Sequence, residues 1–295
     1  SFRQPLKTAR DRRTMTDQIP ECPAATCLTA AACNVLNASE PATKVRFSES
    51  YAADWAGGNI TAIGDYQPPG RPSRPERPEL RPPRDMPRRR FHSVRGRVSF
   101  IHAIAHIELN AIDLAWDMVA RFAGEGLPRD FFDDWTGVAA DEARHFQLLA
   151  GYLKRNGAAY GDLPAHDGLW EAASITCDDI LARLALVPMV LEARGLDTTP
   201  AAIRKFGEAG DQDAAEILTA IAEEEIPHVA AGVRWFEHVC AARGMEPIST
   251  YHRFVRERFK GKLKAPFAAD ARRSAGFDPA YYEPLSALSD PEPSH

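Results

Sequence analysis

Four glutamates and two histidines form two similar sets in this chain of 295 residues. The sets are Glu108, Glu142 and His145, followed by Glu192, Glu225 and His228. The first glutamate of each set precedes the second by 34 or 33 residues, and the second stands three residues before the histidine. A glutamate and a histidine at this short spacing lie on one face of a helix, so a single metal ion can bind both. The spacing therefore predicts metal binding.

The mixture of carboxylate and imidazole indicates which metals would bind. Two divalent ions placed close together need several anionic ligands to offset their repulsion, and two of the four glutamates can bridge them. We therefore predict two metal ions per chain. Iron is favoured, with manganese or a mixed manganese–iron pair as alternatives, because these ions accept nearly the same ligands.

Apolar flanks distinguish these motifs from ordinary surface pairs. A lone Glu-x-x-His box usually lies on a solvated helix face. Glu108, however, lies within Ile-Ala-His-Ile-Glu-Leu-Asn-Ala-Ile, and Glu192 within Val-Pro-Met-Val-Leu-Glu-Ala. An unpaired carboxylate is costly to bury in such surroundings. Two boxes and two apolar-flanked glutamates, in order, favour a metal site over solvated carboxylates.

Acidic residues stand directly before the glutamates of both boxes, Asp141 in the first and Glu224 in the second. Metal-bound histidines usually donate their second N–H to a carboxylate. The run from Asp141 through Arg144 to His145 resembles the Asp-Glu-x-Arg-His signature of di-iron oxygenases and ribonucleotide reductase small subunits. That resemblance implies that Asp141 orients His228 and that Glu224 orients His145. The second box departs from the signature, with Pro227 in place of the arginine.

Other polar and aromatic residues near these motifs are interpreted as structural. They are His102, His106, Asp113, Trp116, Asp117 and Tyr152. His106 lies about 200° around the helix from Glu108, so it faces away from the predicted site. Metal binding by the two histidines and a redox role for Tyr152 are the weaker alternatives.

The periodicity of apolar residues predicts an all-α protein. We expect long helices over 98–123, 130–156, 170–194 and 211–243, and short ones over 199–209 and 249–259. The longest connection falls between the second and third long helices, which is the topology of a ferritin-like four-helix bundle with one crossover. Pro188 and Pro227 predict a kink or local widening. There is no βαβ pattern, Gly-rich phosphate loop or Gly-x-Ser-x-Gly motif.

Composition divides the chain into four parts. We expect a disordered N-terminus (1–23), short helices and a Pro/Arg-rich strap (24–97), the di-metal bundle (98–245) and a C-terminal tail (246–295). Arg71, Arg74 and Arg77 each precede a proline and would line one edge of a polyproline II segment. We favour a strap whose arginines pair with carboxylates of the bundle over an RNA-binding surface.

Charge and cysteine content favour a cytoplasmic protein. The net charge is −5 with a pI near 6.0, no apolar run reaches membrane-spanning length, and no signal peptide is evident. The five cysteines match no zinc spacing. Cys177 and Cys240 lie in helical apolar patterns, so we expect both to be buried thiols.

Several phrases resemble a bacterial ferritin-like family of unknown function. They are Ala-His-Ile-Glu-Leu-Asn-Ala-Ile-Asp-Leu-Ala-Trp-Asp (105–117), Asp-Glu-Ala-Arg-His-Phe (141–146), Tyr-Gly-Asp-Leu-Pro-Ala-His-Asp-Gly-Leu-Trp (160–170), Leu-Glu-Ala-Arg-Gly-Leu-Asp (191–197) and Glu-Glu-Ile-Pro-His-Val-Ala-Ala-Gly (224–232). The resemblance spans about residues 25–270 and implies a bundle with a di-metal centre. It implies no substrate. The chain is more distantly similar to tRNA-hydroxylating ferritin-like enzymes.

Three functions fit these features. The first is a di-metal oxidoreductase, a hydroxylase or oxidase that uses O₂ or peroxide, an electron donor, and a small-molecule or nucleoside substrate. The second is a metal-handling protein for iron or manganese, although the extensions fit lids or the arms of a homodimer better than a storage cage. The third is an RNA-modifying hydroxylase that uses the basic segments.

Overall fold

The structure is a computed structural model that describes residues 20–86 and 91–287. Within these ranges the chain is helical and contains no strand, apart from one isolated bridge between Leu80 and Ala165. The predicted all-α class is confirmed. Most of the segment predicted to be disordered, residues 1–19 of 1–23, lies outside the described residues, as does the end of the tail.

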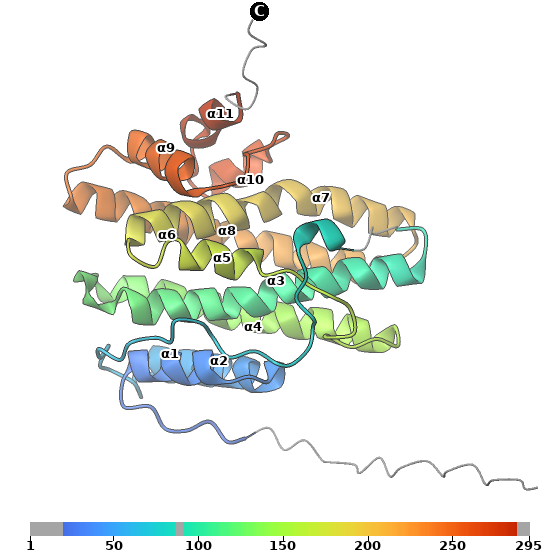
Figure 1. The fold of residues 1–295 in the computed structure, drawn as a ribbon, viewed down its shortest axis with the longest axis horizontal. Coiled ribbons are helices and arrows are strands. Elements are labelled where there is room, and N and C mark those ends of the chain that lie inside the picture. The colour runs from blue at the N-terminus through green and yellow to red at the C-terminus, as the bar shows by residue number, and fades with distance from the viewer. Residues whose placement is uncertain (1–19, 87–90, 288–295) are drawn as a thin grey trace, which may run out of the picture.

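Figure 1 shows the order of the helices along the chain. They are α1 (Leu28–Asn37), α2 (Pro41–Ala56), η1 (Pro83–Asp85), α3 (Val94–Arg121), η2 (Ala123–Glu125), α4 (Arg129–Arg155), α5 (Gly168–Ser174), α6 (Ile180–Leu186), the π-helix η3 (Val187–Glu192), α7 (Ala193–Glu208), α8 (Gln212–Ala242), α9 (Pro247–Arg258), α10 (Ala269–Ser274) and α11 (Pro279–Ala287).

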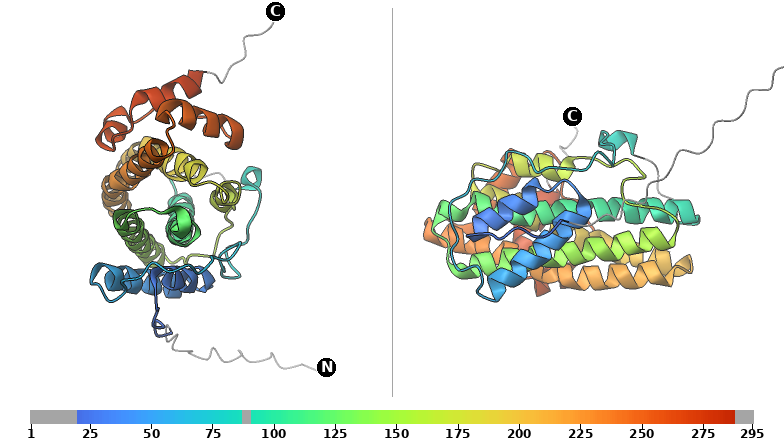
Figure 2. Two further views of the ribbon diagram at one scale, coloured as in Figure 1. Left: turned by 90° about the vertical axis from the view of Figure 1, so that its left-hand side faces the viewer. Right: turned by 90° about the horizontal axis from the view of Figure 1, so that it is seen from below.

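The helices are stacked in layers, as Figure 2 shows. The short helices α1 and α2 cover α3 and α4, which pack closely against each other. The stretch α6–η3–α7 packs along α8, and α8 also contacts α4. The C-terminal helices α9 to α11 cover the far side of α6 and α8. The interior between these layers holds most of the buried apolar side chains.

The helices α3, α4 and α8 form where the sequence predicts them, within about four residues at each end. The helix α3 begins earlier than expected, at Val94, because the hydroxyl of Ser93 accepts a hydrogen bond from Gly96 N at 3.1 Å. Beyond its first turns, α3 is buried on nearly every side. This burial explains why its most apolar stretch lacks a simple amphipathic pattern.

The predicted third long helix over 170–194 is wrong. The chain instead forms α5, a turn at 175–179, α6 and η3. A new helix begins at α6 because Asp179 caps it, its carboxylate accepting from Leu181 N at 2.9 Å. Pro188 cannot donate a backbone hydrogen bond, and the π-helix η3 surrounds it. The local widening predicted at Pro188 is therefore confirmed.

The predicted break between the helices near Gly195 is wrong. The helix α7 does not end near Gly195 and restart at Thr199, but runs unbroken past Pro200. Its apolar face, which includes Leu196 and Phe206, is buried against neighbouring helices, and this packing outweighs the local signals. The helix α8 likewise passes Pro227 without widening.

A connector without long helices joins α2 to α3 and lies beside the bundle (Figure 1). Arg71 and Arg74 both pair with Asp167, at 2.7 Å and 3.4 Å. These contacts agree with the interpretation of this segment as a strap whose arginines pair with carboxylates. The basic segments invoked for the RNA hypothesis include Arg88, Arg89 and Arg90, which lie outside the described residues.

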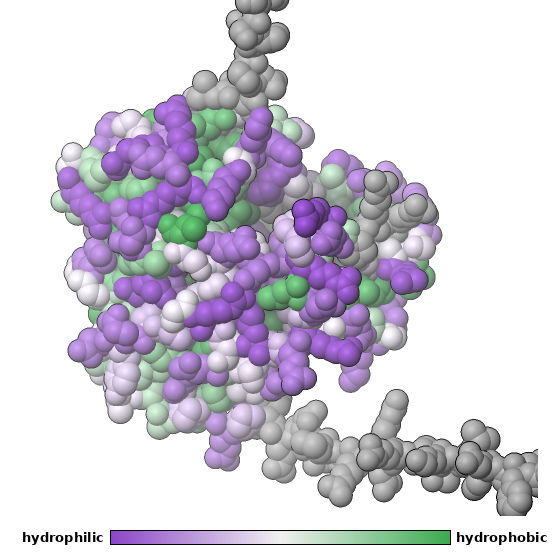
Figure 3. Space-filling model, viewed as in Figure 1, coloured by the Kyte–Doolittle hydropathy of each residue, from purple (hydrophilic) through white to green (hydrophobic). Residues whose placement is uncertain are grey.

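One cysteine prediction is wrong. Cys240 is buried in α8, but Cys177 is exposed, because it lies in the turn before α6 and not within a helix. Of the described helices, α3 alone is long and apolar enough to cross a membrane, and 72% of its most apolar window is buried inside the protein. The face shown in Figure 3 carries mainly hydrophilic side chains, with small scattered apolar patches.

Candidate metal centre

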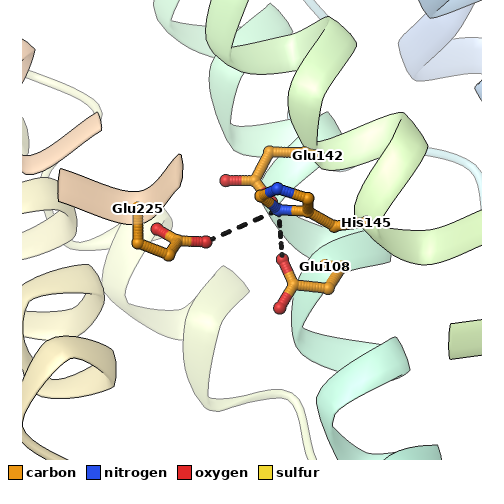
Figure 4. A group of neighbouring side chains, drawn as sticks. All are labelled: Glu108, Glu142, His145 and Glu225. Carbon is orange, nitrogen blue, oxygen red and sulfur yellow. Dashed lines mark ion pairs between the residues drawn. The ribbon is translucent and has the colours of Figure 1, made fainter. Parts of the chain in front are cut away.

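Three helices bring four of the predicted ligands together in the interior (Figure 4). Glu108 comes from α3, Glu142 and His145 from α4, and Glu225 from α8. One ligand atom from each of them lies within 4.8 Å of the others. Such a set of carboxylate and imidazole atoms can hold a metal ion.

The ring of His145 is surrounded by carboxylates on one side. Its Nδ1 lies 3.6 Å from Glu108 Oε2, 3.4 Å from Glu142 Oε2 and 3.6 Å from Glu225 Oε1. The side chain of His145 is fully buried. These four atoms converge from three helices on a position that one cation could occupy.

A second group of atoms is formed around His228. Its Nδ1 lies 3.2 Å from Glu142 Oε1 and 3.4 Å from Glu225 Oε2. Glu142 and Glu225 therefore each direct one oxygen toward His145 and the other toward His228. This arrangement suits two carboxylates that bridge a pair of metal ions.

Glu192 lies at the C-terminal end of η3. Its charge interacts with Glu225, Glu142 and His228, and its Oε2 is buried without a hydrogen-bond partner. The first glutamates of the two sets differ in burial: Glu108 is buried, whereas Glu192 is partly exposed. The structure thus places all six predicted residues around one cluster.

A glycine on α8 allows η3 to approach this cluster. A Cβ atom on Gly232 would lie only 2.4 Å from Pro188 Cβ and 2.7 Å from its Cγ. The ring of Pro188 would have to move if any side chain were present there. The sequence analysis missed Gly232, although it stands four residues after His228 and so lies on the same face of α8.

Several buried polar atoms of the cluster have no hydrogen-bond partner. Among the described residues, nine buried side-chain nitrogen or oxygen atoms are unpaired, and five of them belong to predicted ligands. The five are Glu142 Oε2, His145 Nδ1, Glu192 Oε2, Glu225 Oε2 and His228 Nδ1. Buried polar atoms are normally paired, so this concentration indicates that the atoms serve a further ligand such as a metal ion.

The outer nitrogens of both histidines contact carboxylates. His145 Nε2 lies 2.8 Å from Glu224 Oε2, and His228 Nε2 lies 3.2 Å from Asp141 Oδ2. Because a carboxylate only accepts, Nε2 carries the proton and donates. In the neutral ring, Nδ1 then carries the lone pair toward the cluster, which is the form that binds a metal. Both pairs are those that the di-iron resemblance implied.

Arg144 joins these two outer contacts. Its Nη2 donates to Glu224 and also to Asp141 Oδ1, the latter at 3.1 Å. All three side chains are partly exposed, with about 35 to 41% of each accessible. One arginine at the surface therefore holds both carboxylates that orient the buried histidines.

Burial and crowding shift the pKa values of the cluster. Burial, with repulsion from Glu225, raises the pKa of Glu192 to about 8. Burial, with repulsion from Glu142, likewise raises the pKa of Glu108 well above its usual range. Burial lowers the pKa of His145, but hydrogen bonds to Glu108 and Glu142 outweigh it and raise that pKa to about 11. His228 behaves in the same way, through Asp141, Glu142 and Glu225.

The residues interpreted as structural lie outside this cluster. Tyr152 donates to Asp211 at 2.6 Å, and Trp116 donates to Ser48 at 2.7 Å. His106 bonds with Tyr160 and His166, so it ligates nothing in the cluster. The remaining three are also buried and bonded elsewhere: His102 with Gly161, Asp113 with Lys44, and Asp117 with Arg183 and Arg121.

Comparison with known proteins adds a family but no activity. The model of a family described as "Protein of unknown function (DUF455)" matches residues 37–283, which include the whole cluster. An uncharacterised protein of Haemophilus influenzae is 43% identical over 206 residues, which cover 66% of this chain and 69% of that protein. No solved structure matches this chain.

Metal loading is expected to release protons. At pH 7 and without metal, the raised pKa values keep His145 protonated and Glu192 mostly neutral, and the pKa values of His228 and Glu108 are raised as well. Because a metal binds only the deprotonated ligands, titration with Mn(II) should release at least about two protons per chain. Binding should tighten as the pH rises from about 6 to 8. A pH indicator in weak buffer measures the release; no release with pH-independent affinity would contradict the assignment.

The outer carboxylates are expected to control metal affinity. The substitution Asp141→Asn weakens the acceptor for His228 Nε2, so we expect metal binding to weaken about 10- to 100-fold. Competition with a chelator measures the affinity. Asp130→Asn, an exposed position in the first turn of the same helix, is the matched control and should leave affinity unchanged. Equal metal affinity in the two variants would show that Asp141 does not control metal binding.

Proposed function

This chain belongs to the DUF455 family, a family of proteins of unknown function, and we propose that it is a di-metal carboxylate oxidoreductase. The proposed activity is that of a hydroxylase or oxidase that uses dioxygen or peroxide. One observation carries the proposal: Glu142 and Glu225 each offer one oxygen to the Nδ1 side of His145 and the other to that of His228.

The arrangement of helices supports a ferritin-like bundle as the proposed fold. The four members would be α3, α4, the stretch α6–η3–α7, and α8. The segment from the end of α4 to the start of α6 would be the long crossover between the second and third members. In such bundles a glutamate from each of two helices and a Glu-x-x-His motif from each of the other two project inward.

The chain's own residues would divide the work between binding and positioning. A bound pair of iron or manganese ions would supply the redox chemistry. Glu108 and Glu192 would each complete one metal position, while Glu142 and Glu225 would join the two. Asp141 and Glu224 would hold the imidazoles in the metal-binding tautomer. The surrounding apolar side chains would keep bulk water out.

Solvent access points to the side from which a substrate would approach. Of the Glu225 side chain, 12% is exposed, against 6% of Glu108 and 1% of Glu142. Glu192 is also only partly buried. The cluster is thus most open where α8 faces η3, and we place the substrate on that side.

A storage protein is the second candidate function, and the packing of the terminal segments argues against it. The helices α1 and α2 cover one side of the central helices, and α9 to α11 cover another. A storage cage needs the outer faces of its bundles for contact with other subunits. Covering those faces with the same chain favours an enzyme.

Reaction with oxygen tests the proposed activity. The protein is loaded anaerobically with two equivalents of Fe(II) and then mixed with O₂. We expect stoichiometric oxidation, with absorption and Mössbauer signals of a coupled di-ferric pair, because both irons share two carboxylates. The same experiment on Glu142→Gln is expected to lose the coupled signal.

Excess iron separates the two candidates. An oxidoreductase without substrate is expected to stop after about two irons per chain. A storage protein would continue to oxidise and retain tens of irons per chain. Continued uptake would favour storage, and no oxidation in the loaded wild type would end the oxidoreductase proposal.

A further inference from the structure

A second candidate site lies on the opposite face of α3 from the metal cluster. A cavity of about 320 Å³ lies between this helix, α2 and the strap and is partly open to solvent. Its wall from α3 consists of His106, Leu109, Asn110 and Asp113, which lie on one helical face. Glu108 lies on the other face, so the cavity is separate from the di-metal cluster.

The strap forms a fixed roof over this cavity. On one side, Ser73 N donates to Leu36 O at 2.8 Å. On the other, Ala165 N donates to Glu79 O at 3.0 Å, and Arg81 N donates to Ala165 O at 2.8 Å. The residues between these anchors, including Arg74 and Pro78, therefore span the cavity without filling it.

The floor contains a buried ion pair. Lys44 Nζ lies 2.6 Å from Asp113 Oδ1, and only 1% and 3% of the two side chains are exposed. The ammonium also donates to Val35 O at 3.2 Å. An ammonium has three N–H groups, so one remains for a further acceptor. Burying such a pair is costly, and a purely structural contact would be served by apolar residues.

Arg74 adds a second cation with unused donors. Its Nη2 donates to Asn110 Oδ1 at 2.5 Å and lies near Asp167, while its buried Nε has no hydrogen-bond partner. Asp167 is shared with Arg71 at 2.7 Å. Arg71 and Asp167 lie outside the cavity lining and pair with each other. The lining of the inner end therefore holds two cations, Lys44 and Arg74, against one carboxylate, that of Asp113.

The remaining walls are neutral or acidic. His106 Nε2 must donate to the carbonyl of His166, so its Nδ1 accepts from the hydroxyl of Tyr160 at 2.8 Å. Burial lowers the pKa of His106 to about 4, so the ring is uncharged at neutral pH. At the strap, Glu76 lines the cavity from an exposed position. The cavity is therefore cationic inside and acidic at its mouth.

We propose that this cavity binds a small organic carboxylate of amino-acid size. The ligand's carboxylate lies between Lys44 and Arg74, where charge-assisted hydrogen bonds use the spare donors. An amino group at its other end lies toward Glu76. The volume is at the lower end of that of small-molecule pockets, which matches a ligand of this size. The site acts independently of the metal cluster.

Calorimetric titration of the metal-loaded protein with three matched probes tests this proposal. The probes are butanoate, 4-aminobutanoate and butylamine, which share a four-carbon chain. We expect both carboxylates to bind, 4-aminobutanoate more tightly, and butylamine not to bind. The proposal is overturned if neither carboxylate binds at millimolar concentration, or if butylamine binds as well as they do.

Three variants locate the binding. Arg74→Gln should weaken binding of butanoate at least about tenfold, because it removes a charged donor. Arg71→Gln is the matched control, because Arg71 also pairs with Asp167 but lies outside the cavity lining. This variant should bind butanoate with almost unchanged affinity. The exposed Glu76→Gln should weaken the binding of 4-aminobutanoate and leave that of butanoate unchanged.

Binding in this cavity can still be tested if the Arg74→Gln variant folds poorly. Circular dichroism checks its folding, and Glu76→Gln then carries the test, because this exposed change does not disturb the interior. Equal loss of both carboxylates in Glu76→Gln, or unchanged binding of butanoate in a folded Arg74→Gln, would overturn the assignment.

Discussion

Mutual repulsion among buried carboxylates is the constraint on which the centre of this protein depends. Glu108, Glu142, Glu192 and Glu225 meet in an interior where an unpaired charge is costly. Two protonated histidines balance only two ionised carboxylates, so without a metal ion Glu108 and Glu192 tend to keep their protons, as their raised pKa values indicate. A metal ion held by the cluster would replace those protons and use its unpaired atoms. The outer carboxylates and the arginine that joins them then keep the imidazoles correctly oriented.

The surrounding helices place the predicted ligands close enough together to form this cluster. The helices α3, α4 and α8 present their ligands with ordinary helical geometry. The fourth glutamate, Glu192, comes from the π-helix η3, which contains Pro188. Gly232 on α8 leaves room for the ring of Pro188. On the other face of α3, the strap is anchored by backbone hydrogen bonds and covers a second polar cavity. One long helix thus separates two chemically distinct interiors.

Sequence periodicity predicted the helices whose apolar residues repeat at regular helical spacing. The helices α3, α4 and α8 have long regular patterns, and the six clustered residues have helical spacing, so both could be located beforehand. The interrupted stretch from α5 to α7 could not, because packing carries α7 past Gly195 and Pro200. The helices α10 and α11 were also missed, since they depend on tertiary contacts such as that of Arg272 with Asp197. The partial exposure of Asp141, Glu224 and Arg144 is likewise a property of the folded chain.

Elemental analysis after anaerobic loading with Fe(II) or Mn(II) tests whether the cluster binds a pair of metal ions. We expect about two ions per chain in the wild type and in Glu223→Gln, an exposed neighbour of the cluster on α8. We expect the double variant Glu142→Gln/Glu225→Gln to lose both ions, because each of these side chains would serve both metal positions. A wild type that binds no metal, or a double variant that retains both ions, would contradict the proposed di-metal site.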